Sequence, residues 1–247
     1  KRLNYSVEYV PQIEFHEKEF LIHPYVLGCL IGDGGLTSTG IRLSTPDSDL
    51  LNKVNDLLPD GFSFKYVGKY DYWLSSWRSG HNENAVHKAL REYGLLGCHS
   101  HEKFIPGDYL YASYKQRLWL LKGLLDTDGH AEATYIEYVT TSARLADDIR
   151  DLVHSLGGYC SVTNKCDCGY KDENGEKIPC RDAYRVLIQF SSEQESPFYI
   201  QRKREAYKPK RNKLLRFIKD IVYVGEEDCQ CIYIDDPSHL YITDNYI

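Results

Sequence analysis

A repeat with a fixed offset of 95 residues constrains this chain more than any other feature of its sequence. The stretches 26–34 (VLGCLIGDG) and 121–129 (LKGLLDTDG) share a glycine that is followed five residues later by Asp-Gly. The same offset (128 − 33 = 95) pairs downstream residues, for example Ile41 with Ile136. Self-similarity at a long, fixed period indicates a duplicated structural unit. The chain is therefore predicted to form two similar halves related by a pseudo-twofold axis.

Hydrophobic periodicity predicts the same order of elements in each half. Apolar helices are expected at about 24–33 and 118–126, and each is followed by an alternating strand pattern. An amphipathic helix and two further strands come next, which gives an α+β protein of αββαββα halves with antiparallel sheets. A polar stretch at 165–182 is expected to form a loop. The remaining segments are the strands IRLST, FSFKYV, KYDYWLSSW, YIEYVTT, CSVTNK and AYRVLIQFS, and the helices SDLLNKVNDLL, NENAVHKALREYGLL and RLADDIRDLVHSLGG.

The glycines inside the two signature helices have a stability cost of roughly 1 kcal/mol each relative to alanine. Gly28 and Gly123 would justify that cost if the two helices packed together more closely than the usual ~8–10 Å. Gly34 and Gly129, which follow the aspartates, are expected to form the left-handed turn that often ends a helix.

The two aspartates are predicted to end neighbouring helices side by side. Two close carboxylates repel each other, which raises the pKa of one of them, and a divalent cation relieves that repulsion. Asp33, Asp128 and the backbone carbonyls of Gly32 and Thr127 offer the hard oxygen ligands that Mg²⁺ prefers. Paired metal ions stabilise the attacking and leaving oxygens of a phosphodiester displacement. The alternative is a pair of helix ends with surface aspartates, and the repetition in register favours the metal site.

Composition sets limits on partners and location. The net charge of −6 argues against nucleic acid at first, but residues 221–247 hold six acids and no Lys or Arg. Residues 201–216 carry eight bases and one acid, and local basic surfaces decide phosphate binding, although such a run is equally a solvated face. No apolar run approaches the ~20 residues of a membrane helix, and the first residues lack a signal-peptide segment. We therefore expect an intracellular protein that does not bind membranes.

The eight cysteines are interpreted as reduced thiols, because no secretory segment is evident. Cys166, Cys168 and Cys180 lie near one another in the sequence. Their C-x-C spacing differs from the usual spacing of zinc ligands, so free thiols are favoured and a zinc site is the alternative.

At this point the sequence resembles a known family. LGCLIGDGG and LKGLLDTDG resemble the two signatures of monomeric LAGLIDADG homing endonucleases, and the resemblance runs from about Pro24 to Ala206. The stretch EKFIPGDYLYASYKQRLWLLKGLLDTDG resembles the intein-encoded branch, as does SARLADDIRDLVHSLGG. The first signature has Ile31 and Gly32 where the family name spells Asp and Ala, but it keeps the acid, Asp33.

The resemblance implies roles for a few residues and a set of cofactors. Asp33 and Asp128 would bind two or three Mg²⁺ ions, with Mn²⁺ or Ca²⁺ as substitutes and Ca²⁺ not supporting cleavage. Lys103 would be the active-site lysine that positions solvent or steadies charge near the scissile phosphate. Lys203 is its expected counterpart in the second half, with Lys165 as a rival, and either of these two is equally a phosphate contact.

The resemblance also implies a monomer whose two antiparallel sheets form a saddle over double-stranded DNA, in successive major grooves. Polar and aromatic residues on the strands and hairpins are the candidate contacts, since Arg, Lys and Gln bind base edges and phosphates. For each of them an ordinary surface role is the alternative. The candidates are Arg42, Ser44, Lys65, Lys69, Tyr72, Trp77 and Arg78 in the first half, and Lys165, Lys171, Arg181, Arg185 and Gln189 in the second.

The chain is divided into four parts by these patterns. Residues 1–20 are predicted to contain an N-terminal strand, 21–113 the first half, 114–220 the second half, and 221–247 a C-terminal strand segment. The last stretch, CQCIYIDDPSHLYITDNYI, resembles a splicing segment of inteins, and YSVEYVPQIEF is expected to pair with it as a splicing-domain remnant. The chain lacks Met, the terminal His-Asn pair and the N-terminal splicing blocks. Splicing by this chain alone is therefore not expected. The missing Met is explained either by excision of the chain from a longer polypeptide or by an expression artefact.

These observations favour a site-specific homing endonuclease that makes a double-strand break in a long DNA target by metal-dependent phosphodiester hydrolysis. The resemblance implies that both strands are cut across the minor groove, with short 3′ overhangs. The alternative from another class is a catalytically inactive nucleic-acid binder or RNA maturase on the same scaffold. An aspartic protease is disfavoured because Asp128 interrupts the Asp-Thr-Gly triplet and the stretch is helical in pattern.

Overall fold

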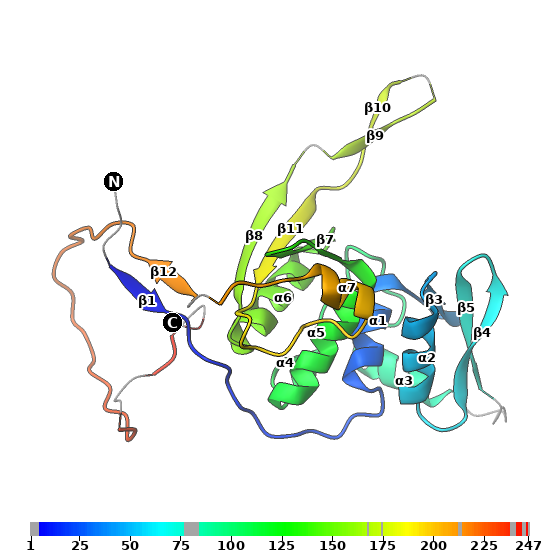
Figure 1. The fold of residues 1–247 in the computed structure, drawn as a ribbon, viewed down its shortest axis with the longest axis horizontal. Helices are drawn as coiled ribbons and strands as arrows, with labels where there is room; N and C mark the ends of the chain where they lie inside the picture. Colours follow the sequence, from blue (N-terminus) through cyan, green and yellow to red (C-terminus); the bar gives the residue numbers. More distant parts are fainter. Residues whose placement is uncertain are drawn as a thin grey trace.

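Two helices packed side by side form the centre of the molecule (Figure 1). They are α1 (Pro24–Asp33) and α5 (Tyr114–Asp128). The computed structural model describes residues 5–76, 84–166, 168–173, 175–211, 214–237, 241–243 and 246. None of the helices in this described part combines the length and the apolar character that crossing a bilayer requires.

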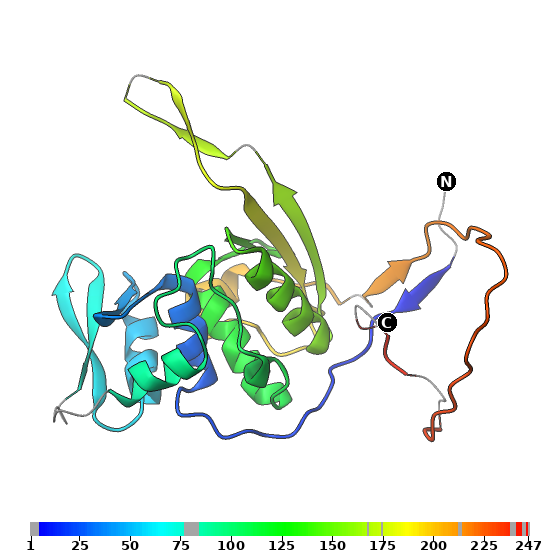
Figure 2. The ribbon, with the colours of Figure 1, turned by 180° about the vertical axis from the view of Figure 1, so that it is seen from behind.

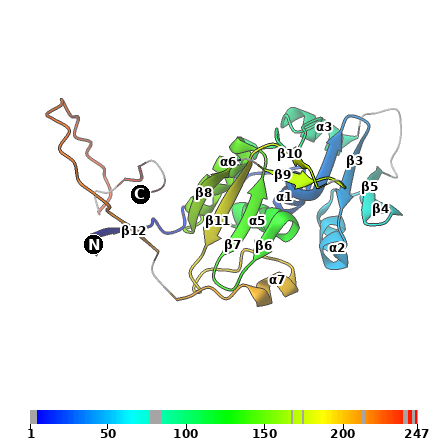
Figure 3. The same cartoon turned by 90° about the horizontal axis from the view of Figure 1, so that it is seen from above.

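Each central helix runs directly into a four-stranded antiparallel sheet (Figure 3). The first sheet has the order β2-β3-β5-β4 and the second has the order β6-β7-β11-β8, so both place their strands in the same topological order. This confirms the duplication, the α+β class and the antiparallel sheets predicted from the 95-residue offset. The strands are β2 (Gly34–Thr37), β3 (Gly40–Ser44), β4 (Phe62–Gly68), β5 (Asp71–Ser76), β6 (Gly129–Ala131), β7 (Ile136–Thr140), β8 (Tyr159–Lys165) and β11 (Ala183–Gln189).

The other helices begin at polar caps that satisfy their first backbone amides. Asp47 caps α2 (Ser48–Leu57), Asn84 caps α3 (Ala85–Glu92), and Ser142 caps α6 (Ala143–Ser155). These three helices lie where the amphipathic patterns predicted them. Two short helices, α4 (Gly107–Leu110) and α7 (Gln201–Ala206), complete the set.

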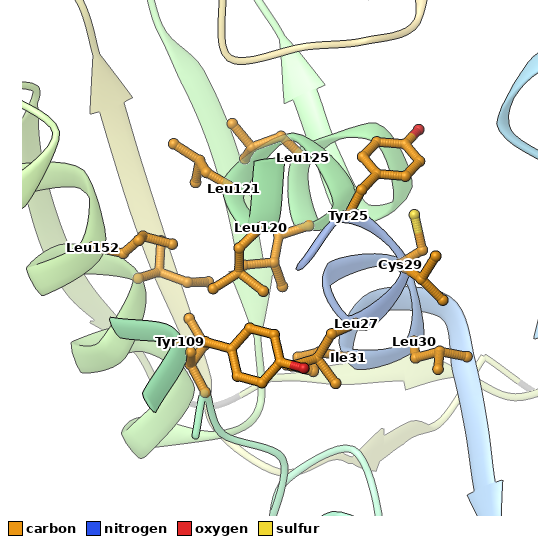
Figure 4. Close-up of a cluster of buried hydrophobic side chains, with 14 of the residues drawn as sticks. Tyr25, Leu27, Cys29, Leu30, Ile31, Tyr109, Leu120, Leu121, Leu125 and Leu152 are labelled. Atoms are coloured by element: carbon orange, nitrogen blue, oxygen red, sulfur yellow. The ribbon is translucent and has the colours of Figure 1, made fainter. Parts of the chain in front are cut away.

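A continuous apolar core joins the two halves through the central helices. Figure 4 shows Leu27 and Ile31 of α1 with Leu120 and Leu121 of α5, and Leu152 of α6 lies in the same cluster. All five side chains are buried. The helix pair therefore shares one apolar core with the elements around it.

The two helix-interior glycines allow this packing, as predicted. A Cβ atom at Gly28 would lie 2.3 Å from the backbone oxygen of Leu120, and one at Gly123 would lie 2.2 Å from that of Tyr25. Each glycine thus contacts the backbone of the opposite helix, and any side chain there would force the helices apart.

The prediction that left-handed turns follow these helices was wrong. Gly34 (φ −79°, ψ 136°) and Gly129 (φ −78°, ψ 132°) are extended, because the chain passes without a turn into β2 and β6. Glycine is required there for space rather than for a positive φ. A Cβ would lie 2.2 Å from the oxygen of Leu30 in the first half and 2.5 Å from that of Leu125 in the second.

The terminal segments and the stretch 165–182 differ from the sequence-based expectations. Strand β1 (Ser6–Glu8) pairs with β12 (Leu215–Phe217), not with the last 19 residues, and no strand occurs in the described residues 218–237. The apolar side chains at 221–224 are 70–86% exposed, so this segment is not packed against the described part of the chain. Residues 165–182 are also not a plain loop. They contain the hairpin of β9 (Gly169–Lys171) and β10 (Lys177–Pro179), which projects away from the second sheet (Figures 1 and 2).

Candidate active site

The carboxyl groups of Asp33 and Asp128 meet where the two central helices end. The two side chains are hydrogen-bonded to each other. A Cβ atom built on Gly32, at the end of α1, would lie 3.4 Å from Oδ2 of Asp128 and 2.1 Å from Oγ1 of Thr127. The close approach that Gly28 and Gly123 permit along the helices therefore continues to their C-terminal ends, and it brings the two acids together.

This pairing favours retention of a proton. Desolvation by the surrounding protein, followed by the charge of Asp33, raises the pKa of Asp128 to about 6. Desolvation also raises the pKa of Asp33. Two neighbouring carboxylates repel each other when both are ionised, so the pair favours holding one proton between them.

Two lysines occupy equivalent positions at the ends of the two helices. Lys103 and Lys203 are 5% and 8% exposed, and the ammonium group of each is surrounded by backbone carbonyls. The Nζ of Lys103 donates to the oxygens of Leu30, Ile31, Gly32 and Gly34 at 2.7–3.3 Å, and the Nζ of Lys203 donates to those of Leu125, Asp126, Thr127 and Gly129 at 2.7–3.2 Å.

The acceptors of one lysine are those of the other shifted by the repeat offset of 95 residues. This makes Lys203 the geometric counterpart of Lys103, whereas Lys165 lies exposed at the end of β8. Burial lowers the pKa of both Lys103 and Lys203 to about 8. The charges of Asp128 and Asp33 oppose that shift at Lys103, and the charge of Asp126, followed by those of Asp128 and Asp33, opposes it at Lys203. A cation here is favourable, since the last carbonyls of a helix lack intrahelical partners and carry its negative dipole end.

Asp126, which the sequence reasoning did not select, holds Lys203 in position indirectly. Its buried carboxylate accepts hydrogen bonds from the Tyr25 hydroxyl (2.9 Å) and from the backbone amides of Tyr199 (3.0 Å) and Ile200 (3.3 Å). Those amides immediately precede α7, which carries Lys203. Burial raises the pKa of Asp126 to about 6. The first half has no acid at this position, because Ile31 is its equivalent.

The segment that carries Lys103 is anchored by different groups. The Ser142 hydroxyl donates to the backbone oxygen of Lys103 at 2.7 Å, and the amide of Ile105 donates to Oδ2 of Asp148 at 2.7 Å. Both anchors belong to α6 or its cap, so the second half positions the lysine of the first half. Neither Ser142 nor Asp148 could be identified as an anchor from the sequence, since each lies about 40 residues along the chain from the residue that it holds.

Tyr138 makes the acid pair asymmetric. Its buried hydroxyl lies 3.4 Å from Oδ2 of Asp128, and its equivalent in the first half is Leu43. Asp128 therefore has a neutral donor beside it that Asp33 lacks.

One face of each sheet packs on the helices, and the other is open. On the open face of the first sheet, Arg42 pairs with Trp73, and Lys65 pairs with Trp73 from the other side. The proposal of Tyr72 as a DNA contact fails here, because Tyr72 lies opposite buried Leu43 on the helix-covered face. The alternation of side chains across a strand exposes its neighbour Trp73 instead.

The remaining candidate contacts fall into three groups. Ser44 in the first sheet and Lys165, Arg185 and Gln189 in the second lie on the open faces. Lys69 lies in the turn between β4 and β5, Arg181 is exposed after β10, and Lys171 belongs to β9. Trp77 and Arg78 lie outside the described residues.

The cysteine-rich hairpin does not gather a metal site. In the described part of the chain, no group of three or more His, Cys, Asp or Glu side chains is placed to hold an ion. Cys180 instead continues the hairpin ladder, since its amide donates to the oxygen of Cys168 at 2.8 Å. All eight cysteines are free thiols.

Comparison with known proteins gives matches to one sequence family and to several longer proteins. Residues 115–193 match the family described as LAGLIDADG-like domain. The chain is 30% identical over 249 residues to the replicative DNA helicase DnaB of Mycobacterium intracellulare, a match that covers 98% of the chain and 37% of that protein. It is 28% identical to the protein of the same name from Synechocystis sp., over 66% of the chain and 20% of that protein. The chain thus spans little more than a third, or less, of these relatives.

Solved structures with a similar arrangement include crystal structures of the homing endonuclease I-DmoI. The complex with DNA and Ca aligns at a TM-score of 0.43 and 13% identity, over 69% of this chain and 83% of that one. The complex with DNA and Mn aligns at 0.42 and 14% identity, over 68% and 89%.

Proposed function

We propose that this protein is a site-specific homing endonuclease that makes a double-strand break in a long DNA target by divalent-metal-dependent hydrolysis. One observation carries the proposal: two carboxylates are brought together at the ends of two glycine-packed helices, beside two sheets with open faces. The match of residues 115–193 to the LAGLIDADG-like domain supports the same conclusion.

The residues at the helix ends fit a divalent cation. A proton held between Asp33 and Asp128 could be displaced by a bound cation, which would leave two carboxylate oxygens for a hard ion. The carbonyls of Gly32 and Thr127 each accept one lysine donor and keep a second lone pair. Mg²⁺ is usually bound through one or two carboxylates together with substrate phosphates, so a larger protein cage is not needed. When bound, such an ion would stabilise the attacking and leaving oxygens of the phosphodiester.

The other residues of the site fix its geometry. Lys103 and Lys203 neutralise the carbonyl ends of α1 and α5 and so hold the two acids in place. Because their donors are used by the backbone, we propose that the lysines act on the phosphate through their charge rather than through a direct hydrogen bond. Asp126 and Tyr138 complete the second half: Asp126 accepts hydrogen bonds from the backbone that precedes α7, and Tyr138 donates toward Oδ2 of Asp128.

Both halves of the binding surface are present in one chain, so we propose that a monomer contacts the whole double-stranded target. The open faces carry Arg, Lys, Gln and Ser side chains suited to base edges and phosphates. The two sheets would form a saddle in successive major grooves, with the acids between them.

We further propose that the chain belongs to the intein-encoded branch. Residues 102–129 carry the resemblance to that branch. Matches to limited parts of longer proteins, each named as a replicative helicase, support an insertion within such a polypeptide. In this scheme 21–113 and 114–220 are the two nuclease halves, and residues 1–20 and 221–247 are the segments that join them to the host.

Selection of cleaved sites tests the proposal. The chain is incubated with a randomised duplex library and Mg²⁺, and the new ends are sequenced. We expect both strands to be cut at one preferred long site, with no cutting by Asp33→Asn or after chelation. Asp147→Asn, which removes an exposed charge on α6, should cut normally. Enrichment of bound duplexes that are never cut would instead establish the non-catalytic binder.

A further inference from the structure

Each sheet carries one arginine–acid pair on its open face. In the first sheet, Nη1 of Arg42 lies 3.6 Å from Oδ2 of Asp71. In the second, Nη2 of Arg185 donates to Oε2 of Glu137. The four side chains are 51%, 38%, 44% and 25% exposed, in that order, so they remain accessible to a ligand that covers the sheet.

The strand registers make these two pairs equivalent under the pseudo-twofold relation. Gly34 pairs with Leu43 as Gly129 pairs with Tyr138, which aligns β3 with β7. Leu43 in turn pairs with Tyr72 as Tyr138 pairs with Val186, which aligns β5 with β11.

The charges of the two pairs are inverted. The alignment places Arg42 of β3 at the position of Glu137 of β7, one residue before the aligned Leu43 and Tyr138. It places Asp71 of β5 at the position of Arg185 of β11. The base lies on the second strand of the sheet, β3, in the first half and on the third strand, β11, in the second. The molecule is therefore symmetric in fold but antisymmetric in charge at this position.

The chemistry of such a pair matches one kind of base pair. An arginine donates two hydrogen bonds to O6 and N7 of guanine, and a carboxylate accepts one from N4 of cytosine. The major groove admits a two-stranded ribbon, so neighbouring strands lie side by side across it. An Arg–acid pair that bridges two strands then fits a G·C pair, with the guanine on the side of the arginine. The acid also repels phosphates, which directs the pair toward the base edges.

Resting on the DNA-binding function proposed above, we propose that these two ion pairs determine specificity, each for one G·C base pair in its half of the target. Because the charges are inverted, the guanine lies on the same DNA strand in both half-sites. A palindromic target would place the two guanines on opposite strands. The site is thereby expected to break its own twofold symmetry at this position.

The ion pairs also pre-organise the donors and acceptors. Oδ1 of Asp71 accepts a hydrogen bond from the Ser44 hydroxyl at 2.5 Å, which fixes the carboxylate beside Arg42. Glu137, the least exposed of the four, holds Arg185 without such help. A side chain that is already oriented loses less conformational freedom when it binds.

Binding selection tests this inference separately from cleavage. The intact chain selects duplexes from a randomised library with Ca²⁺ in place of Mg²⁺, and the bound sequences are aligned. We expect one preferred G·C pair in each half, at symmetric distances from the centre, with both guanines on one strand. Guanines on opposite strands, or no G·C preference at these positions, would overturn the inference while leaving DNA binding intact. A failure to enrich any sequence would remove the proposed function as well.

A charge swap then assigns the preference to the residues. Glu137→Arg combined with Arg185→Glu keeps the net charge and should move the guanine to the other strand in the second half alone. We expect the favoured orientation to be preferred by about 5- to 150-fold, the range of one good bidentate contact, in the parent and, in the opposite sense, in the swapped variant. Lys88→Glu combined with Glu92→Lys swaps an exposed pair on α3 and should change nothing. An unchanged preference after the swap at 137 and 185, in a variant that still binds, contradicts the assignment.

Discussion

Replacing Gly28 by alanine should separate the central helices and move the two acids apart. The new Cβ would lie 2.3 Å from the oxygen of Leu120 and 2.9 Å from the amide nitrogen of Leu124. These are helix backbone atoms, which cannot rotate away as a side chain can. Relief to an ordinary contact of 3.4 Å requires a shift of about 1 Å at the crossing (3.4 − 2.3).

The expected stability cost combines two opposing effects. Overpacking costs about 3 kcal/mol, at the upper end of the usual range because the obstacle is backbone. The better helix propensity of alanine offsets about 1 kcal/mol of this. A net loss of about 2 kcal/mol corresponds to a fall in Tm of roughly 4–8 °C for a chain of this size. Since a misplacement of ~1 Å can lower a rate about 100-fold, DNA cleavage should fall more than stability alone explains.

Thermal unfolding and the cleavage rate at 25 °C measure both effects. Gly107→Ala is the matched control, because a Cβ at that exposed position meets nothing within 4 Å. Gly123→Ala should resemble Gly28→Ala, since its Cβ would lie 2.2 Å from the oxygen of Tyr25. Unchanged Tm and cleavage in Gly28→Ala would refute the close helix contact as the feature that positions the acids.

Three further predictions concern the acid pair, the lysines and the hairpin. The folded pKa of Asp128, about 6, exceeds its ordinary 3.8, so the protein loses stability as pH rises from about 4 to above 6. Asp128→Asn should therefore raise the free energy of unfolding at pH 7.5, by only ~1 kcal/mol because the residue is solvent-exposed. The same variant should give no gain at pH 4, where Asp128 of the parent is protonated. A gain that is equal at both pH values would contradict the shared proton. Lys203→Met and Lys103→Met should each lower the Tm and the cleavage rate, whereas Lys165→Met, on an exposed strand end, should weaken DNA binding modestly at most. An effect of Lys203→Met as small as that of Lys165→Met would remove the equivalence of Lys103 and Lys203. Cys168 and Cys180 face each other at the end of the β9–β10 hairpin ladder. Oxidised glutathione should therefore join them in a disulfide, which peptide mapping detects. Preferential joining of Cys166 to either cysteine would show that the ladder ends earlier.

The elements of the two halves could be predicted from the sequence because their patterns are local and occur twice. The helix over 24–33 and the strand after it follow from apolar spacing, and the second copy removes the ambiguity of a short pattern. The extended Gly34 could not be foreseen, since a glycine after a helix usually adopts a left-handed turn. Any side chain at Gly34 would collide with the backbone oxygen of Leu30, and this constraint is visible only in the three-dimensional structure.

The residues of the candidate site could be predicted where they lie within the repeated motif or a recognisable stretch beside it. Residues that depend on neighbours from other strands could not be predicted. Asp33, Asp128 and Lys103 stand in recognisable stretches. Tyr72 was assigned to the wrong face because the alternation of KYDYWLSSW, taken alone, does not say which set of side chains faces the helices. Glu137 was missed because its significance depends on a cross-strand neighbour, Arg185, that lies 48 residues away.

Counting the metal ions bound beside the acids tests the central claim most directly. Mn²⁺ binding to the complex of the chain with its selected duplex can be followed by electron paramagnetic resonance. The parent and Asp147→Asn should retain Mn²⁺ with the same affinity, and Asp33→Asn and Asp128→Asn should each lose it while still binding DNA. Retention of the parent affinity for Mn²⁺ in either single variant would contradict joint binding by the two carboxylates.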